Sequence, residues 1–542
     1  RSPLSSDFLI EQPPVNEYVD EVTYEQVPLE QRGELSLSSG KYLNYTGKLT
    51  VNYNKRFGEK HLLFFGAGAE INQNKTSTYS FTATGFADDR YSDPAFAIQF
   101  MKDSRPGSSE STTRSIGLLA NVNYIFDDRF FLDLSGRYDG SSLFGVDKRW
   151  APFWSIGGGW NIHKEHFWSS DNILDLLKIR MSYGITGNQE FQAYQAQTMY
   201  QYQTGRLYNT LVPATLMGYG NENLKWQNQY TTNVGVDLGM WKNRLSFMFN
   251  YYYKKTDGML AKITVAPSLG IPSNNFTSNL GEIENKGWEI TLSGSPLRMP
   301  EADLEWRLSF QISQNRNKLN EISNELKNLN ARNNMEMEIP GNVYEEGESM
   351  TAIKAVPSLG IDPGTGQEIY VKKDGSLTME WDAADKILCG DTEPDVFGNI
   401  STNLYWKGFN LNAVFQYSIG GDVYNQTLAS RVEGVNPSGN ADRRVLNYRW
   451  TTPDQCALYR NIRDYGQTYV STRFVQCDNY LDLTSLSLSY DLKKEWIQRF
   501  GLESVRVSFY MNDLFRASTV KQERGTSYPF ARSFSFGLNI GI

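Results

Sequence analysis

The last ten residues of the chain alternate strictly between apolar and small polar side chains. Successive side chains on an extended strand point to opposite faces, so one face of this segment is entirely apolar. The apolar residues are Phe534, Phe536, Leu538, Ile540 and Ile542. The other face carries only serine, glycine and asparagine. Taken alone, the segment fits a strand of a soluble sandwich and a membrane-spanning strand equally well, since both have one apolar face.

The same alternation recurs along the chain and predicts about sixteen strands. Residues 116–126 and 130–138 form one predicted hairpin, and residues 232–240 and 245–253 form another. Their connections alternate in length. Short turns follow Phe57, Phe126, Met240 and Trp406, whereas long polar stretches cover residues 72–113, 254–284, 314–395 and 418–479. Short turns at one end and long loops at the other are typical of outer-membrane barrels. Short helices are expected at residues 170–176 and 493–500.

Composition agrees with an all-β, transmembrane antiparallel β-barrel that occupies the whole of residues 1–542. The 542 residues are 40% hydrophobic and 13% aromatic. No apolar run approaches the roughly 18 residues that a spanning helix needs. The formal net charge of -8 argues against a nucleic-acid partner, because such proteins neutralise phosphates with basic residues. The aromatic residues at predicted strand ends suit the girdles of a barrel at the membrane interfaces.

Candidate contacts to a substrate or a plug lie on the predicted inner face. Arg137, Asp139 and Ser141 follow one strand with alternating spacing, and charged residues there need water or partners. The alternative, which we favour, is that Arg137 and Asp139 join neighbouring strands by ion pairs. Asn188 and Gln189 lie where another strand ends, and they suit either a turn or a contact to sugar hydroxyls or peptide backbone.

Residues that bind metals or act in catalysis are sparse. His163 and His166 have metal-like spacing but only Glu165 beside them, so a solvated turn is the favoured interpretation. The stretches 362–366 and 372–375 predict hairpin turns rather than a calcium site, and the same holds for Asp391, Glu393 and Asp395. We therefore expect no metal, no cofactor and no enzymatic activity. Cys456 and Cys477 either pair or remain free thiols, and Cys389 stands apart.

Several motifs, in order along nearly the whole chain, resemble the SusC/RagA family. They are Arg137-Tyr-Asp-Gly-Ser-Ser-Leu-Phe-Gly, Trp154-Ser-Ile-Gly-Gly-Gly-Trp, Ser182-Tyr-Gly-Ile-Thr-Gly-Asn-Gln, Asn221-Glu-Asn-Leu-Lys-Trp, Asn285-Lys-Gly-Trp-Glu, Gly360-Ile-Asp-Pro-Gly-Thr-Gly, Trp406-Lys-Gly-Phe, Tyr480-Leu-Asp-Leu and Asn512-Asp-Leu-Phe. The resemblance implies a TonB-dependent importer in the outer membrane of Bacteroidetes. It also implies a 22-stranded barrel with an internal plug, and a SusD-like lipoprotein that helps to capture glycans or peptides.

The chain departs from that pattern in one large respect. It shows about sixteen strands, with no plug and no TonB box, so we expect a missing segment or a second chain to supply the plug and the first strands. The closing strand is then expected to place Phe534, Phe536, Leu538, Ile540 and Ile542 against membrane lipid. An active importer is the favoured function. A passive porin or structural barrel is the alternative, and an outer-membrane hydrolase would need a nucleophile–base pair that the sequence does not present.

Overall fold

A computed structural model of the chain is dominated by one antiparallel sheet of sixteen strands. It describes residues 28, 30, 33–86, 93–101, 104–168, 173–188, 193–202, 208–264, 275–279, 281–322, 327, 330, 335, 340–341, 343–436, 442–464, 467–521 and 532–542. Each strand of the sheet pairs with the strands before and after it along the chain. The prediction of about sixteen strands in an all-β architecture is confirmed.

The strands of this sheet, called the wall, pair in chain order, and the two-residue β3 (Gln99–Phe100) joins the end of β2. They are β1 (Glu34–Phe57), β2 (His61–Thr84), β4 (Gly107–Phe126), β5 (Phe130–Ser141), β6 (Trp150–Asn161), β7 (Leu174–Asn188), β10 (Gln227–Met240), β11 (Leu245–Asp257), β14 (Glu282–Met299), β15 (Leu304–Glu321), β21 (Val396–Trp406), β22 (Phe409–Tyr424), β23 (Val475–Asp491), β24 (Ser504–Ser518) and β25 (Phe534–Gly541).

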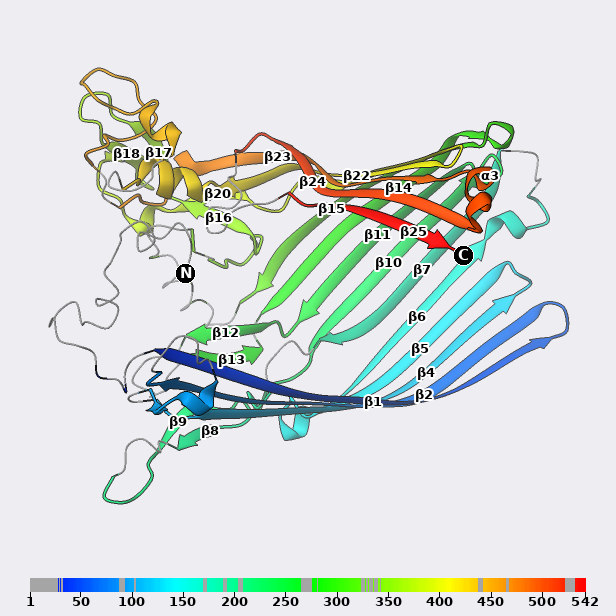
Figure 1. The fold of residues 1–542 in the computed structure, drawn as a ribbon, viewed down its shortest axis with the longest axis horizontal. Coiled ribbons are helices and arrows are strands. Elements are labelled where there is room, and N and C mark those ends of the chain that lie inside the picture. The colour runs from blue at the N-terminus through cyan, green and yellow to red at the C-terminus, as the bar shows by residue number, and fades with distance from the viewer. Residues whose placement is uncertain are drawn as a thin grey trace.

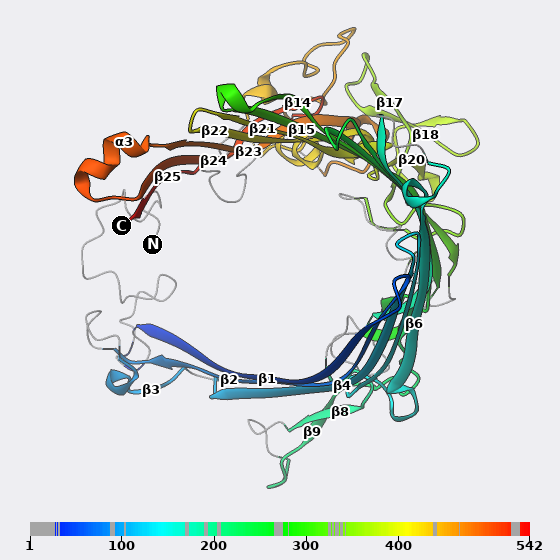
Figure 2. The same cartoon turned by 90° about the vertical axis from the view of Figure 1, so that its right-hand side faces the viewer.

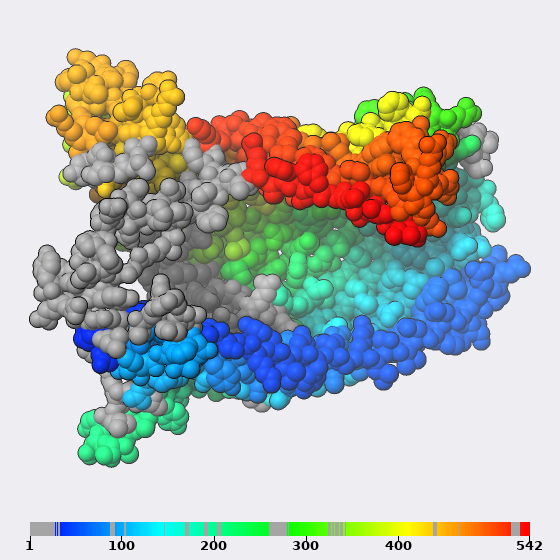
Figure 3. All heavy atoms as spheres, in the orientation of Figure 1, coloured from blue at the N-terminus to red at the C-terminus, as the bar shows by residue number. Residues whose placement is uncertain are grey.

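The wall curves around a central interior, and its two edges stand apart (Figures 1 and 2). β1 forms one edge and β25 the other, and among the described residues neither pairs with a further strand on its outer side. The space-filling view shows the hollow between these edges, with the middle strands lining its far side (Figure 3). The described part of the chain is therefore an open, strongly curved wall.

Tight turns at one end of the wall, the short-turn end, follow the prediction. Asp127 and Asp128 join β4 to β5, and both have positive φ angles, of 53° and 56°. With Arg129 they form a three-residue connection, and positive φ at two consecutive residues matches the twist of the strands that it joins. Gly58 and Gly408 also have positive φ angles in the turns after β1 and β21. The opposite end, the long-loop end, carries the extended connections.

The wall strands run further toward the long-loop end than the sequence predicted. The polar stretch 72–113 was expected to be a loop, but β2 continues to Thr84 and β4 begins at Gly107. The prediction relied on apolar alternation, whereas polar pairs hold these extensions: Thr78 bonds Ser109 across the strands (2.9 Å), and Lys75 pairs with Glu110 (2.7 Å). The same correction applies where β11, β15 and β22 continue past residues 254, 314 and 418.

One of the two expected short helices is present. The connection between β23 and β24 contains α3 (Lys494–Ile497) and a 3-10 turn, η12 (Gln498–Phe500). The helix expected at residues 170–176 is wrong in its described part, because β7 already begins at Leu174. There the apolar alternation of β7 outweighs the local helical pattern. Residues 169–172 lie outside the described residues.

The outer face of the wall is apolar and exposed, as the alternation predicted. On the closing strand β25, Phe536 is 75% and Leu538 is 62% exposed, while Phe534, Ile540 and Ile542 are also exposed. On the middle strands β14 and β15, Leu292 and Phe310 are also exposed, at 39% and 37%. Nothing within the described chain covers this belt. A soluble domain would not leave so continuous an apolar surface in water.

Two regions outside the wall lie at its long-loop end. Residues 352–391, 425–436, 442–464 and 467–474 pack together into a unit that we call the cap, which stands beyond the end of β23 in Figure 1. Its strands are β16 (Ala352–Ala355), β17 (Ser358–Ile361), β18 (Glu368–Val371), β19 (Leu377–Thr378) and β20 (Ile387–Asp391). Two small hairpins, β8–β9 (Met199–Tyr202, Ala214–Gly218) and β12–β13 (Leu260–Thr264, Asn275–Asn279), complete the sheets.

Short helical turns make up the remaining elements. They are η3 (Pro94–Phe96), η4 (Val146–Lys148), η5 (Ile162–Lys164), η7 (Pro300–Ala302), η8 (Ala383–Asp385), the π-helix η9 (Leu428–Glu433), η10 (Arg443–Leu446) and η11 (Thr472–Phe474). The predicted hairpin turns within the long loop are confirmed. Residues 362–366 connect β17 to β18, where the Asp362 side chain accepts bonds from Thr365, and residues 372–375 lie between β18 and β19.

Candidate functional site

Side chains on the inner face of the wall pair their charges with one another. On β5, Arg137 bonds Asp139 at 2.6 Å and approaches Glu70 of β2 at 3.9 Å. Gly117 of β4 lies between them, and a Cβ there would come within 2.8 Å of Arg137 Nη2. Because Gly117 has no side chain, Arg137 has room to lie across β4. The geometry therefore agrees with an ion pair of Arg137 and Asp139. The pair lies chiefly within β5, and only the longer contact to Glu70 reaches another strand.

A second inner-face pair has the same construction. Arg180 of β7 bonds Asp237 of β10 at 3.2 Å, and its guanidinium also bonds the Asn250 side chain of β11. Gly235 lies underneath, because a Cβ added there would stand 2.7 Å from Arg180 Cζ. Glycines at alternate inner positions thus let long cationic side chains lie flat against the sheet. The sequence analysis did not recognise this pair, although the alternation of β7 and β10 contains it.

The other predicted site residues are not gathered with this pair. Ser141 is buried at the end of β5, where its backbone N–H donates to the Arg149 carbonyl (3.1 Å). Its hydroxyl accepts a bond from the Leu143 N–H (3.3 Å). Asn188 ends β7 opposite Gln227 of β10. Gln189 lies outside the described residues. The contacts of Ser141 are those of a turn, and its role in ligand binding stays a prediction.

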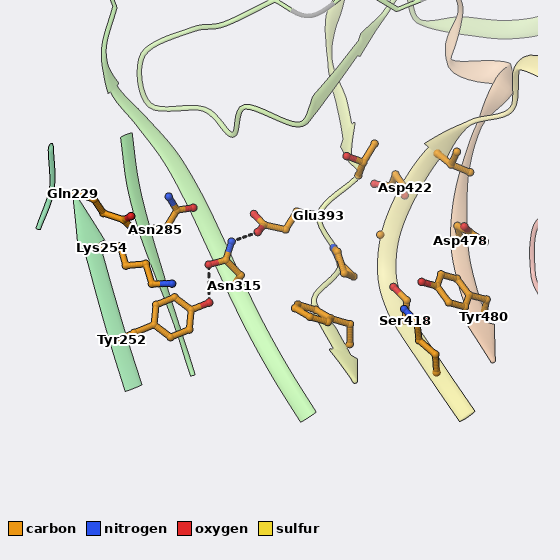
Figure 4. A pocket seen from close by; sticks show the side chains of 16 residues that line it. Gln229, Tyr252, Lys254, Asn285, Asn315, Glu393, Ser418, Asp422, Asp478 and Tyr480 are labelled. Carbon is orange, nitrogen blue, oxygen red and sulfur yellow. Dashed lines mark hydrogen bonds between the residues drawn. The ribbon is translucent and has the colours of Figure 1, made fainter. Parts of the chain in front are cut away.

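A cavity of about 740 Å³ opens on the inner face near the long-loop end (Figure 4). Strands β10, β11, β14, β15, β21, β22 and β23 each contribute to its lining. The lining is rich in amide, carboxylate and aromatic side chains, and it includes Gln229, Tyr252, Lys254, Asn285, Asn315, Glu393, Asp422 and Tyr480. This mixture offers both hydrogen-bond donors and acceptors next to aromatic rings. We treat it as the candidate ligand site and call it the rim cavity.

A chain of hydrogen bonds fixes one side of the rim cavity. The Tyr252 hydroxyl donates to Asn315 Oδ1 (2.9 Å), and the Asn315 amide donates to Glu393. Glu393 Oε2 also accepts bonds from the backbone and side chain of Asn317, at 3.0 and 2.6 Å. Glu393 thereby attaches the segment before β21 to the inner face of β15. Two strands, β11 and β15, and one loop therefore hold this part of the cavity in a single geometry.

A β-bulge sets which side chains line the other side of the rim cavity. The pairing of β22 and β23 shifts where Val414 and Phe415 stand opposite Ser485 and Leu483, so Thr484 is an extra residue on β23. The pairing of β23 with β24 shifts at the same place, where Asp513, with a positive φ of 50°, and the residue after it lie opposite Thr484. The extra residue Thr484 reverses the alternation, so residues beyond it change face. Tyr480 and Asp478 consequently line the cavity. Arg516 lies over the Tyr480 ring at 4.3 Å and bonds Asp478 (3.4 Å) and Asp482 (3.3 Å).

This bulge explains why the sequence analysis missed Tyr480 as a site residue. With unbroken alternation, Tyr480 would share the outer face with Leu486 and Leu488. The Asn512-Asp-Leu-Phe motif was quoted only as part of a resemblance. Asn and Asp tolerate the left-handed conformation better than most residues, so Asp513 signals the irregularity of β24 but not the extra residue on β23 that turns Tyr480 inward.

Above the rim cavity, the cap is held by buried charges. The Glu433 side chain is 0% exposed and accepts bonds from Arg460 (2.9 Å) and Arg473 (2.9 Å). Arg473 also bonds Glu368 at 2.7 Å, and Arg449 donates to the carbonyls of Val432 and Glu433. Burial alone would raise the pKa of Glu368, but the bond and charge of Arg473 outweigh it and hold that pKa below its ordinary value.

The described residues offer no metal centre or helical membrane span. No group of three or more His, Cys, Asp or Glu side chains among them could hold a metal ion. His163 contacts the Leu177 carbonyl, while Glu165 bonds Arg129 and Trp160. Cys389, Cys456 and Cys477 are free thiols, so Cys456 and Cys477 do not pair in this structure. In the described ranges, no helix has the length and apolar character needed to cross a membrane.

Comparison with known proteins identifies the family. The family described as "TonB dependent receptor-like, beta-barrel" matches residues 15–346, which is more than half of the chain. The chain belongs to the TonB-dependent receptor family. Its members lie in the outer membrane of Gram-negative bacteria, and they are transporters rather than enzymes.

Individual relatives of this TonB-dependent receptor are of the SusC and RagA type. It is 27% identical to TonB-dependent receptor P3 of Formosa agariphila over 92% of this chain and 53% of that protein. It is 26% identical to TonB-dependent receptor SusC of Bacteroides thetaiotaomicron over 78% of this chain and 43% of that protein. The chain thus spans about half the length of the curated relatives that it matches.

The fold comparison agrees with the sequence comparison. The structure of the RagAB peptide transporter superposes with a TM-score of 0.80 at 23% identity, covering 92% of this chain and 54% of that one. The wall of this TonB-dependent receptor therefore has the fold of the barrel wall in that transporter. The predicted recognition, fold class and outer-membrane location are confirmed.

Proposed function

We propose that this TonB-dependent receptor is the wall of an active importer that takes up glycans or peptides with a SusD-like lipoprotein. The observation that carries the proposal is the rim cavity at the long-loop end, which is the extracellular end in barrels of this class. A ligand captured outside meets amides, carboxylates and aromatic rings there, before it reaches the interior enclosed by the wall (Figures 3 and 4).

The inner face supports passage of a polar ligand. Arg137 and Arg180 are neutralised by Asp139 and Asp237 in the wall itself. Because each charge has a partner within the sheet, a passing sugar or peptide meets a hydrated polar surface rather than isolated charges that would hold it. Arg137, Asp139, Ser141, Asn188 and Gln189 are, in this proposal, weak contacts along the path rather than determinants of affinity.

Energy-coupled transport needs parts outside these 542 residues. We propose that a missing segment or second chain supplies a plug with a TonB box and the strands that pair with the free edges of β1 and β25. Among the residues that the structure describes, the backbone groups along both outer edges have no strand partner, which supports this proposal, because exposed sheet edges do not persist within lipid. Outer-membrane lipid then covers the exposed belt that includes Phe536 and Leu538.

The experiment measures uptake by the complete transporter in its native host. Cells are given labelled oligosaccharides or labelled peptides, with TonB present and with TonB deleted. We expect uptake of one ligand class, lost when TonB is deleted. Uptake that continues without TonB would instead support the passive porin, and mass spectrometry of the purified complex would show whether a plug and a lipoprotein accompany the wall.

Two substitutions test the rim cavity within the same assay. Tyr480→Ala and Gln229→Ala remove an aromatic ring and an amide from opposite sides of the cavity. Each is expected to weaken ligand binding by roughly tenfold, the effect of losing one good polar or stacking contact. Ser401→Ala is the matched control, since Ser401 lies on the wall away from this cavity. Unchanged binding in both cavity variants would move the ligand site elsewhere.

A further inference from the structure

The short-turn end has two long connections, residues 162–173 between β6 and β7, whose described part contains η5, and residues 492–503 between β23 and β24. Most of its turns are a few residues long, whereas residues 492–503 between β23 and β24 fold into α3 and η12 (Figure 1). Ile497 is buried beneath the helical turn, at 4% exposure. Gly501, with a φ of 71°, ends it, and its N–H donates to the Gln498 carbonyl. The segment is therefore an ordered element with a packed underside.

Its exposed side is aromatic. Trp496 is 54% and Phe500 is 78% exposed, although both are large apolar side chains. Trp496 lies in α3, and Phe500 ends η12, the 3-10 turn that directly follows it. A single exposed aromatic residue is ordinary, but two on one ordered segment cost solvation free energy unless something covers them.

Three basic side chains and one acidic side chain, the exposed Glu495, flank these aromatic residues in the sequence. Lys493 lies over the Trp496 ring at 5.8 Å, and Lys494 and Arg499 are exposed beside it. The neighbouring turn between β21 and β22 repeats the arrangement, with Lys407 at 5.8 Å over the half-exposed ring of Trp406. The two turns are in contact, since the Asp491 N–H donates to the Gly408 carbonyl (2.8 Å). We call these residues, 406–408 and 493–500, the basic aromatic patch.

The patch continues the apolar outer face of the wall. β23 and β24 carry Leu488 and Val507 on that face, and residues 492–503 follow directly at their short-turn end. Aromatic residues flanked by lysine and arginine are enriched where a membrane core meets its headgroups. Short amphipathic turns with a basic rim bind such interfaces and favour anionic lipids.

We propose that the basic aromatic patch binds the headgroup region of anionic phospholipids in the leaflet at the short-turn end. Trp496 and Phe500 insert at the level of the ester groups, while Lys493, Lys494 and Arg499 contact phosphates. The proposal rests on the outward face lying in lipid. It adds a specific lipid preference at one place on the circumference, next to the edge strand β25, whose Gly541 carbonyl accepts a bond from the Glu503 N–H (2.8 Å).

The test uses tryptophan fluorescence of the complete transporter in vesicles of phosphatidylcholine and phosphatidylglycerol in equal parts. The contribution of Trp496 is obtained by subtracting the emission spectrum of the Trp496→Phe variant from that of the wild-type protein. We expect phospholipids brominated near the headgroup to quench it roughly twofold more strongly than phospholipids brominated near the chain end. Trp450→Phe, which removes a cap tryptophan at the far end, should not change the lipid-quenched emission.

Charge is tested separately with Lys493→Gln/Lys494→Gln/Arg499→Gln. Mass spectrometry of the detergent-extracted complex should show wild-type protein retaining phosphatidylglycerol over phosphatidylcholine, and this preference should fall roughly tenfold in the triple variant. An unchanged preference overturns the headgroup contact. Insertion of Trp496 into the membrane is overturned if aqueous iodide quenches its emission and brominated lipid does not. In that case Trp496 faces a soluble partner or open water instead.

A wall tryptophan separates this inference from the membrane placement on which it rests. Trp154 is 44% exposed on the outer face of β6. If chain-brominated lipid quenches the Trp154 contribution but no lipid quenches that of Trp496, only the patch proposal fails. If neither tryptophan responds to lipid, the outward face is not in lipid and the membrane placement itself fails.

Discussion

The wall and the cap of this TonB-dependent receptor place apolar and charged side chains in opposite environments. The wall exposes its large apolar side chains, such as Leu538 at 62%, and keeps charged residues in pairs along the inner face. The cap buries Val356, Val432 and Val470 completely and encloses Glu433 with its arginines. One region is built for lipid on its outside, and the other is built like a small soluble domain.

The difference shows where each region obtains its stability. In the wall, antiparallel backbone pairing runs through every strand, so no single side chain holds it together. The cap has strands of two to five residues and depends on a few buried contacts. Substitutions in the cap are therefore expected to act locally and strongly, while those in the wall depend on the face and depth of the residue.

The largest effect is expected for Glu433→Ala in the cap. The substitution leaves Arg460 and Arg473 buried without their shared carboxylate, and removing one partner of a buried ion pair costs about 3–5 kcal/mol. Hydrogen exchange should rise throughout residues 352–391 and 442–464 and stay unchanged in β4 to β7. Glu380→Gln, at an exposed cap position, is the control. Equal loosening of wall and cap would show that the two regions are not independent.

The next effect is expected for Leu538→Arg on the outer face of β25. If Leu538 lies near the membrane midplane, the charge destabilises the folded wall by about 2–4 kcal/mol. Denaturant unfolding of the complete protein in lipid vesicles would measure it. The same change at the inward-facing Asn539 on this strand should cost much less. A negligible cost at Leu538 would contradict its placement against lipid.

A smaller effect is expected for Gly235→Ala on the inner face. The added methyl group would lie 2.7 Å from Arg180 Cζ, so Arg180 must move away from Asp237. Overpacking of this kind costs about 1–3 kcal/mol. Gly136→Ala, at an outward-facing strand position where nothing lies within 4 Å of an added Cβ, is the control for the loss of a strand glycine as such. Comparable losses of stability in both variants would mean that the glycine does not act by making room for Arg180.

The smallest effect is expected from acid acting on the cap. The pKa of Glu368 is held below its ordinary value of about 4.3, so its contribution to stability is complete above that pH and is lost as the pH falls through the folded pKa. Hydrogen exchange of β17 and β18, corrected for its intrinsic pH dependence, should increase below about pH 4. In Glu368→Gln this dependence should weaken, and an identical pH profile would exclude Glu368 as its source.

The sequence went far in predicting the wall and much less far in predicting the site. Alternation gave the faces of β5, β10 and β11 correctly, and turn residues such as Asp127 and Asp128 marked where strands reverse. The predicted strands were too short at the long-loop end. Polar cross-strand pairs such as Thr78 and Ser109 hold the strands together there, and the alternation of apolar residues does not reveal such pairs. The sequence also predicted a helix where β7 begins, because a few residues there fit both the helical and the strand periodicity.

The sequence by itself determined a large, curved antiparallel wall, because a period of two repeated over about sixteen segments permits little else. Only the tertiary structure decided the rim cavity and the cap. The bulge at Thr484 turns Tyr480 inward, and Glu433 meets Arg473 across 40 residues of chain. Such contacts depend on strand register and on long-range packing, which local periodicity does not encode.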